Sequence, residues 1–484
     1  MRRWPRPGAA SSFAPGRLVS VLSALAVVVT LLGCASSSTI DRAATEERFA
    51  PLRTALAAYD SAGFLVGPPV FPVVGRAFTL PGPGDTVYLG FAASLPPAAL
   101  RFARDEDAVA ARYQVVLRVR AGGDTLMRVE RREVVRVKDF EEAASRAPRV
   151  VFQRLLKVPA GRLQLDVTVR ELTSRSEGTR TFDVDARSGL SPPLLAYRAE
   201  PRSSRADTPA VLVSPRSVAY ATQSPPPVLV EDAAGAATPL VLGVDHEGSP
   251  VWEDTLFAVP GSTEGGDAAA PGLVSVVTAL PVHLLPPGRA TLRVGRPGEG
   301  SAAAPVYIGL GPEWVFPTWE TSLAHLEYAL EADTLKRWSA APAAEHASLW
   351  RRFQDRTDPD PATPENEFLR RYLDRMNDAN DRFDEPGRAG WETDRGQVLV
   401  KLGEPDRQRF IPPERQGEVP RIEWEYDESV PTSALIAFED TSDFGVYVMT
   451  PRSRAALRRV VAELAAADAA ARQGVPGPDG TPQG

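Results

Sequence analysis

"ARYQVVLRVRAGGDTLMRVERREVVRV", residues 111–137, decides the fold class of the chain. Apolar and polar residues alternate through its first half, which is the pattern of a strand with one buried face. The buried face of that strand would carry Tyr113, Val115, Leu117 and Val119. A Gly-Gly-Asp turn at 121–124 then leads into a second alternating segment. The stretch therefore predicts two antiparallel strands of a β-sheet with one face in a hydrophobic core.

The same period of two recurs in two sets of segments. The first set is completed by 85–95, 158–172 and 179–186, where Leu163, Leu165, Val167 and Val169 share one face. A second set begins near Pro209 and contains seven short segments of the same kind. Six or seven short strands with regular turn signals are typical of a β-sandwich. We therefore expect two β-sandwiches, immunoglobulin-like or transthyretin-like.

After Gly311 the apolar residues recur every three or four positions, which predicts helices. The best-marked helix is 363–383, with Thr363 expected as its N-cap and Pro364 in its first turn. Its apolar stripe consists of Phe368, Tyr372, Met376, Ala379 and Phe383, widened by Leu369 and Leu373. Short alternating segments follow, including "QVLVKL" at 397–402, which we expect to be a strand.

The chain of 484 residues is too long for one hydrophobic core. We expect a multidomain protein, mainly β with an α+β unit near its end. The expected order is a signal peptide at 1–33, a tether and short helix at 34–80, sandwiches at 81–190 and 207–311, a helical region at 312–384, an α+β unit at 385–450, and a closing helix with a disordered tail at 451–484.

The N-terminus has the features of an export signal. Four arginines precede or adjoin an apolar segment of 16 residues at 18–33, which is short for a membrane span. The segment ends in "LLGC", and Cys34 is the only cysteine. This ending resembles the bacterial lipobox, in which the cysteine carries the lipid. The resemblance implies that Cys34 is the lipidation site and that the mature protein is held at a membrane by acyl chains.

Charge limits the classes of partner. Removal of 1–33 takes away four arginines, so 51 basic and 62 acidic residues remain and the net charge is −11. This balance argues against binding nucleic acid, and against binding anionic lipid by charge. With a single cysteine, no disulfide can form within the chain. We expect no cofactor.

"GWETDRGQVLVKLGEPD", residues 390–406, carries the most specific signature. With "DPDPATPENEF" before it and "WEYD" and "FGVYVM" after it, the segment resembles the GWxTD-domain family of bacterial envelope proteins. That resemblance implies an architecture and a cell-envelope location but no established reaction. Ala35, and not Asp, follows Cys34, and by the rule of enteric bacteria this favours the outer membrane, where we expect the protein to face the periplasm. We therefore expect an adaptor without enzymatic activity that meets an envelope protein partner.

Each residue of this motif has a structural explanation. The glycines suit turns with positive φ, Thr393 and Asp394 suit acceptance of backbone N–H bonds, and Trp391 suits a buried anchor. Arg395 is expected to pair with Asp394, Glu404 or Asp406. The motif residues, as structural elements or as a partner surface, are Gly390, Trp391, Thr393, Asp394, Gly403, Pro405 and Asp406.

Three alternatives remain open. Asp394 and Asp406 beside Trp391 would suit a carboxylate-dependent hydrolase, and Trp391 with Trp424 would suit glycan binding. The acidic run 358–367 faintly resembles a calcium loop, but its prolines and the lack of a central glycine break the pattern. His246, His283, His325 and His346 are scattered without ligand spacing, so no metal site is expected.

A second resemblance concerns the small lipoprotein subunit of the outer-membrane β-barrel assembly machinery. It rests on Thr393, the Val-Leu-rich segment, "LGEPD" at 402–406 and "WEY" at 424–426. In that subunit the segment before "LG-P" is a helix, whereas "QVLVKL" alternates here and predicts a strand. The resemblance implies a role in outer-membrane assembly or in the biogenesis of surface structures.

Overall fold

The computed structural model describes residues 50–473, apart from 106–107, 146–149, 188, 234–238, 258–271, 313–314, 316–317, 361, 364, 386–387, 416 and 443. The expected signal peptide, Cys34 and the tail after 473 lie outside the described residues. The chain divides into two compact units, Met1–Pro51 and Leu52–Gly484. The described residues are mainly β: 42% lie in strands, which form several antiparallel sheets, and 25% lie in helices, which confirms the expected mainly-β class. None of the described helices is long and apolar enough to span a bilayer.

The first β region consists of two sheets. One sheet has the order β1-β2-β3-β7, with β1 Leu65–Val66, β2 Val74–Pro81, β3 Thr86–Leu95 and β7 Val150–Pro159. The other has the order β4-β5-β8-β9 with β6 also paired to β5; these are β4 Ala103–Asp105, β5 Ala108–Ala121, β6 Asp124–Val137, β8 Gly161–Glu171 and β9 Glu177–Ala186. Short helices η1 Pro97–Ala99 and α3 Phe140–Ala143 connect them.

The two sheets share a hydrophobic core, and the faces expected from the sequence are the buried ones. Tyr113, Val115, Leu117 and Val119 on β5 are at most 2% exposed and pack with Leu163, Leu165, Val167 and Val169 on β8. The hairpin at 111–137 forms as predicted, with β5 and β6 antiparallel. The region begins earlier than expected, because β1 and β2 lie in the segment 34–80 that the sequence suggested was tether. Of that segment, the expected short helix is present as α2, Ala50–Ser61.

The second β region also has two sheets. One has the order β11-β10-β13-β16, with β10 Leu194–Ala199, β11 Val211–Val213, β13 Pro227–Asp232 and β16 Val274–Ala279. The other has the order β12-β18-β17-β14-β15, with β12 Val218–Tyr220, β14 Leu240–His246, β15 Ser249–Leu256, β17 Gly288–Gly295 and β18 Ser301–Gly309. The short helix η2, Val282–Leu284, precedes β17. The region starts at β10, before the expected boundary at 207.

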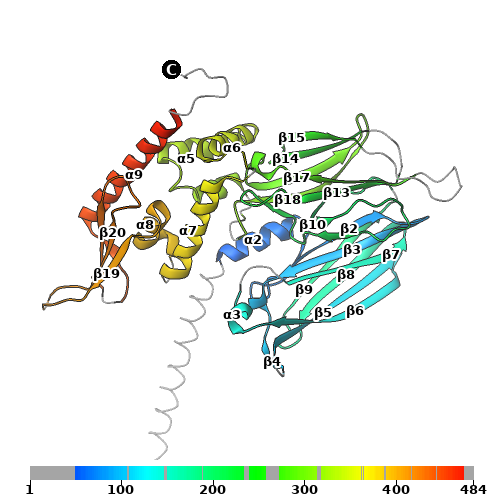
Figure 1. Cartoon of the computed structure of the whole chain (residues 1–484). Helices are drawn as coiled ribbons and strands as arrows, with labels where there is room; N and C mark the ends of the chain where they lie inside the picture. Colours follow the sequence, from blue (N-terminus) through cyan, green and yellow to red (C-terminus); the bar gives the residue numbers. More distant parts are fainter. Residues whose placement is uncertain are drawn as a thin grey trace, which may run out of the picture. The chain divides into compact units, whose positions relative to one another are not determined.

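A further apolar cluster joins the two β regions, which follow one another along the chain in cyan and green in Figure 1. Phe78, Leu80 and Ala92 on the first sheet pack against Leu194, Ala196, Val211, Val213 and Leu229 of the second region. Gln153 on β7 extends this contact, because its Nε2 donates to Val211 O (2.6 Å) and its Oε1 accepts from Val213 N (2.8 Å).

A buried ion pair lies at the same junction. Arg202, between β10 and β11, donates through Nε to Glu231 Oε1 (2.8 Å) on β13 and through Nη2 to Pro81 O (2.8 Å) at the end of β2. The side chains of Arg202 and Glu231 are 3% and 0% exposed. Removing Glu231 would leave a buried guanidinium without a counter-charge. Arg202 also links the two regions, because its Nη2 bond reaches Pro81 of the first region.

The C-terminal half combines helices with a four-stranded sheet. The helices are α4 Trp319–Ala324, α5 Ala332–Ser339, α6 Ala343–Thr357, α7 Glu367–Phe383, η3 Gly390–Glu392, α8 Asp394–Leu402 and α9 Pro451–Gln473. The sheet order is β19-β20-β21-β22, with β19 Arg407–Ile411, β20 Arg421–Tyr426, β21 Ala434–Glu439 and β22 Val448–Met449. One core spans α4 to α9, so the expected division at 384 is not a boundary between cores.

Helix α7 begins later than the sequence suggested. Its N-cap is Asn366, whose Oδ1 accepts from Leu369 N (2.9 Å), and not Thr363. Asn366 is the N-cap because its Nδ2 also donates to Gln354 Oε1 (2.7 Å) on α6. Thr363 lies before the helix, and its hydroxyl donates to the side chain of Glu367, the first residue of α7. The predicted stripe is otherwise confirmed: six of its seven residues are buried and Phe368 is partly buried.

The segment "QVLVKL" is helical, so the expected strand is wrong. It belongs to α8, which packs against α7. Val398, Leu399, Val400 and Leu402 are all buried, so the helix is covered on several sides at once. A short helix of this kind produces the same run of apolar residues as a buried strand, and periodicity alone cannot separate the two.

Candidate functional site

The GWETD segment begins with a glycine that touches helix α7. A Cβ at Gly390 would lie 2.1 Å from Ala379 O and 2.7 Å from Asn380 Cα. The expected positive φ does not occur at this residue; the requirement for glycine comes from the close approach of two backbones. Asn380 also accepts from Trp391 N through Oδ1 (3.1 Å), which fixes the segment on α7.

Trp391 is a buried anchor, 7% exposed. Its ring lies 5.5 Å from the ring of His325 and 5.6 Å from that of Tyr328. Burial lowers the pKa of His325, against the opposing effect of nearby Glu392. Since the indole faces the core, it has no free face on which a sugar ring could stack.

Thr393 and Asp394 join the start of α8 to its surroundings. Thr393 is the N-cap: its Oγ1 accepts from Gly396 N (3.1 Å) and donates to Gly390 O (2.7 Å). Asp394 Oδ2 accepts from Met449 N (2.7 Å) on β22 and from Arg454 Nη2 (2.9 Å) on α9. Both residues therefore accept backbone N–H bonds, as the sequence predicted.

The end of the motif closes α8 and starts the sheet. Gly403 follows α8 with φ +85°, the positive value predicted, and its carbonyl accepts from Tyr426 Oη (3.0 Å). Pro405 is half-buried in the connection to β19. Asp406 Oδ2 accepts from the amides of 427 (2.6 Å) and 428 (2.8 Å), and these bonds hold its pKa below the usual range.

The motif therefore ties α7, α8, the sheet and α9 together, and its two aspartates serve different partners. Asp394 binds β22 and α9, whereas Asp406 binds the turn after β20. Arg395 does not make the expected carboxylate pair. Its guanidinium lies instead over the rings of Phe383 (4.7 Å) and Tyr447 (4.9 Å). The arrangement suits cohesion of the unit better than acid–base chemistry.

The other proposed ligand surfaces are also occupied by local contacts. Trp424, invoked with Trp391 for glycan binding, is 1% exposed and packs on Phe438. In the acidic run 358–367, Asp358 and Asp360 accept backbone amides two residues ahead, at 3.1 Å each. Such turn bonds explain these carboxylates without a cation.

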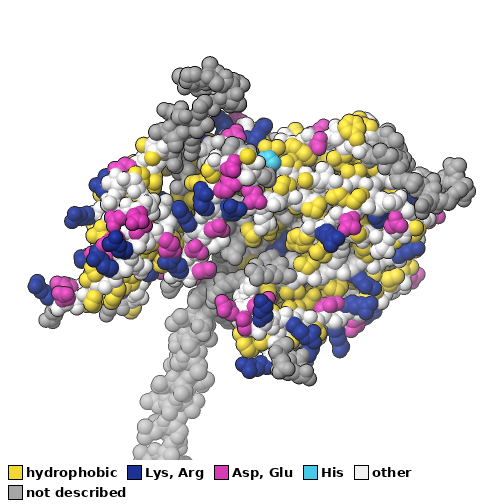
Figure 2. Space-filling view, in the orientation of Figure 1, with side chains coloured by type: hydrophobic (Ala, Val, Ile, Leu, Met, Phe, Trp, Pro, Cys, Tyr) yellow, Lys and Arg dark blue, Asp and Glu magenta, His cyan; other side chains and the backbone are white. Residues whose placement is uncertain are grey.

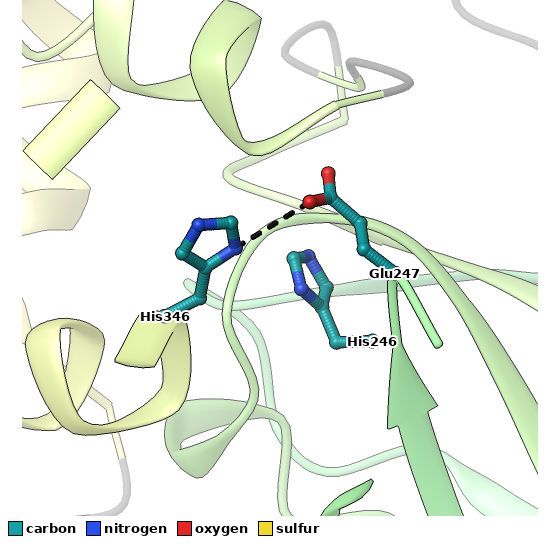
Figure 3. A group of neighbouring side chains, drawn as sticks. All are labelled: His246, Glu247 and His346. Atoms are coloured by element: carbon teal, nitrogen blue, oxygen red, sulfur yellow. Dashed lines mark ion pairs between the residues drawn. The ribbon is translucent and has the colours of Figure 1, made fainter. Parts of the chain in front are cut away.

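Within the described residues, one group of three side chains has the donor atoms and spacing for a metal ion: His246, Glu247 and His346 (Figure 3). His246 ends β14, Glu247 lies in the turn to β15, and His346 lies in the first turn of α6. Their donor atoms lie within 4.8 Å of one another. Both imidazoles are buried, and the carboxylate reaches the group from the surface.

Each imidazole is held by a backbone carbonyl. His246 Nε2 lies 3.1 Å from Pro287 O, and His346 Nε2 lies 3.0 Å from Ala341 O. Burial lowers the pKa of His246, which favours its neutral form. No local sequence pattern predicts this group, because its two histidines are separated by one hundred positions and only the packing of α6 on the β14–β15 hairpin brings them together.

Comparisons with known proteins add little. Neither a protein-family model nor a curated protein sequence matches the chain. Among solved structures, trypsin-activated alpha-2-macroglobulin from Escherichia coli matches with 11% identity and a TM-score of 0.16, over 49% of this chain. The match covers 17% of that protein's length.

Proposed function

We propose that this chain is a lipid-anchored lipoprotein of the bacterial cell envelope that presents its C-terminal unit to a protein partner. In this proposal Cys34 carries the lipid, the body faces the periplasm from the outer membrane, and the β regions, immunoglobulin- or transthyretin-like, act as spacer and binding modules. The unit that ends in α9 is of the GWxTD-domain type, and the protein is an adaptor without a cofactor and not an enzyme.

The observation that carries the proposal is the edge strand β19. It pairs with β20 on one side, and among the described residues no strand pairs with its other side. Arg407, Gln408, Arg409 and Phe410 are all exposed, and Phe410 is 60% exposed as a residue. A short, free edge with an exposed aromatic residue suits addition of an extended segment from another protein.

The contrast with β6 supports this choice. Strand β6 is also a free edge in the described residues, but it is 14 residues long and rich in arginine and glutamate. Charged side chains on a long edge are a common protection against unwanted pairing. Strand β19 has two arginines that pair with glutamates of β20, which leaves Phe410 as the apolar group available to a partner.

The charge distribution is consistent with a protein partner and not with a nucleic acid. On the face shown in Figure 2, acidic and basic side chains are interspersed, and the whole chain is acidic. Recognition of a phosphate backbone needs a concentrated basic surface.

Helix α8 also supports a place in outer-membrane assembly. A strand at 397–402, as the sequence predicts, would distinguish residues 393–426 from the small lipoprotein subunit of the β-barrel assembly machinery, which has a helix at that place. With a helix at that position, this difference disappears. The proposed partner is accordingly an envelope protein that takes part in the assembly of the outer membrane or of surface structures.

In-cell photo-crosslinking of the full-length protein tests the proposal. A photoreactive phenylalanine analogue replaces Phe410, and the matched control replaces Val134, which is 41% exposed on β6. We expect one reproducible envelope protein attached at 410 and absent at 134. A protein attached equally at both positions, or none at 410, would contradict the adaptor function.

A separate experiment tests the anchor. Cells labelled with a radioactive fatty acid should incorporate label into the wild-type protein, and Cys34→Ser should abolish both the label and recovery in the membrane fraction. Retention of the Cys34→Ser protein on membranes would show that another element holds it there.

A further inference from the structure

The group formed by His246, Glu247 and His346 brings acceptor atoms together without a donor between them. A carbonyl oxygen only accepts, so the Nε2 atom of each histidine carries the hydrogen that it donates to Pro287 O or Ala341 O. In a neutral ring the other nitrogen, Nδ1, is then an acceptor. Both Nδ1 atoms are buried without a hydrogen-bond partner. The Nδ1 of His346 lies 3.6 Å from Glu247 Oε2, which is also an acceptor.

We propose that His246 Nδ1, His346 Nδ1 and a carboxylate oxygen of Glu247 bind a zinc ion. Two imidazoles and a carboxylate form a common zinc ligand set, with bonds of about 2.0–2.2 Å and hence about 3.3–3.6 Å between tetrahedral ligands. The distance from His346 to Glu247 already has this value. The largest separation in the group, 4.8 Å, exceeds that spacing by about 1.2–1.5 Å and requires a side-chain adjustment of that size.

The residues behind the ligands hold them in place. A backbone carbonyl behind each imidazole is the usual support of a metal-binding histidine, because it fixes the tautomer and the ring orientation. Trp319 contributes twice: its indole stacks on His346 with 4.6 Å between centroids, and its backbone N–H donates to Glu247 Oε1 (3.2 Å). That bond leaves Oε2 directed at His346.

The backbone at Glu247 points to the same use. Glu247 and Gly248 form the two-residue turn between β14 and β15, with φ of +49° and +83°. A turn with two positive φ values favours Asn-Gly, and a glutamate in the first position is disfavoured. A strained residue whose carboxylate meets two buried imidazoles is explained if that carboxylate is a ligand (Figure 3).

Zinc at this position would link the β14–β15 hairpin to α6, and so the second β region to the helices. Three protein ligands leave one tetrahedral position for water or for an incoming donor group. The inference is independent of the adaptor function, since β19 contributes nothing to this group.

The test uses the full chain, purified in detergent and stripped of metal with a chelator. Zinc alone is titrated by calorimetry against a competing chelator, and we expect one ion per chain. Glu247→Asn is the main variant: Asn-Gly suits the turn, so the hairpin should form while the affinity falls at least about 100-fold, the upper end of the loss seen for residues behind a ligand. His346→Phe, which keeps a ring on Trp319, should lose affinity similarly.

The matched control is Asp254→Asn, which removes a carboxylate from the same hairpin and should leave the affinity unchanged. X-ray absorption of the zinc-loaded protein should show imidazole nitrogen and oxygen without sulfur, which excludes Cys34. Zinc should also slow hydrogen exchange at the start of α6 in the wild type but not in Glu247→Asn. No stoichiometric ion, a sulfur ligand, or undiminished binding by Glu247→Asn would overturn the assignment.

Discussion

Gly396→Ala sets two physical effects against each other in α8. Alanine in a helix is favoured over glycine by about 1 kcal/mol, so propensity alone predicts a more stable helix. However, a Cβ at this position would lie 1.9 Å from Gly390 O and 2.8 Å from Trp391 Cα. Both are backbone atoms of η3 and cannot rotate away from the new methyl group, so in Gly396→Ala the segment η3 would have to shift away from α8. Overpacking costs about 1–3 kcal/mol, and a contact this short belongs at the upper end, which leaves a net loss of about 2 kcal/mol.

Hydrogen exchange with mass spectrometry on the full chain measures this effect where it arises. A loss of about 2 kcal/mol should speed exchange of the amides that open with α8 about 30-fold, since each 1.4 kcal/mol is a factor of ten. Gly300→Ala is the control, because an added Cβ at Gly300 would have no neighbour within 4 Å apart from the adjoining residues of the chain. Hydrogen exchange around residue 300 should change less than about threefold in this variant. Unchanged or slower exchange of α8 in Gly396→Ala would refute the close approach.

Three further predictions concern groups around the same unit. Asp394→Ala should speed hydrogen exchange in β22 and α9 and lower the free energy of unfolding by about 1–3 kcal/mol, because the amide of Met449 loses its acceptor. Asp394→Asn should lower it less. Loss of the cellular phenotype at unchanged stability would instead indicate a direct functional role for Asp394. Burial lowers the pKa of His325, so its contribution to stability is complete above the unfolded pKa of about 6.5 and is lost as the pH falls toward the folded pKa. The fall in Tm between pH 7.5 and pH 5 should therefore be smaller in His325→Gln than in the wild type. An equal fall in the two proteins would contradict this prediction. Backbone amides lower the pKa of Asp406, so the amides of the turn at 427–429 should stay protected from hydrogen exchange above about pH 4 and lose protection below the folded pKa. In Asp406→Asn the same amides should exchange faster at pH 7. Equal protection in variant and wild type would exclude the hydrogen bonds from this turn to Asp406.

Strands with one covered face gave the clearest sequence signal, whereas β10, which is covered on both faces, was missed. Strand β5 alternates because solvent or polar groups meet its other side, and its buried residues were identified individually. Strand β10 contributes Leu194 and Ala196 to the layer between the two β regions and Leu195 to the core of its own region, so its apolar residues run together. A strand buried on both faces lacks the period of two on which the prediction depends.

The same limit applies to the sites. Thr393 and Gly403 were interpretable because a cap and a positive φ depend on neighbours a few residues away. The N-cap of α7 was decided by Gln354 on another helix, and the position of Arg395 by two rings. The histidine group requires α6 to pack on a hairpin one hundred residues earlier, and no local pattern contains that information.

The apolar layer between the β regions has a consequence for the order of events during synthesis. The sheet β1-β2-β3-β7 is complete once residue 159 has been made, but Phe78 and Leu80 receive their last cover only with Leu229, 70 residues later. At roughly 5–20 residues per second this interval lasts roughly 4–14 seconds. Until then the nascent chain carries an apolar sheet face whose cover is incomplete, the kind of surface that holding chaperones bind. A chain that stops before β13 would never lose it, and we expect such fragments to aggregate even though their first core is intact.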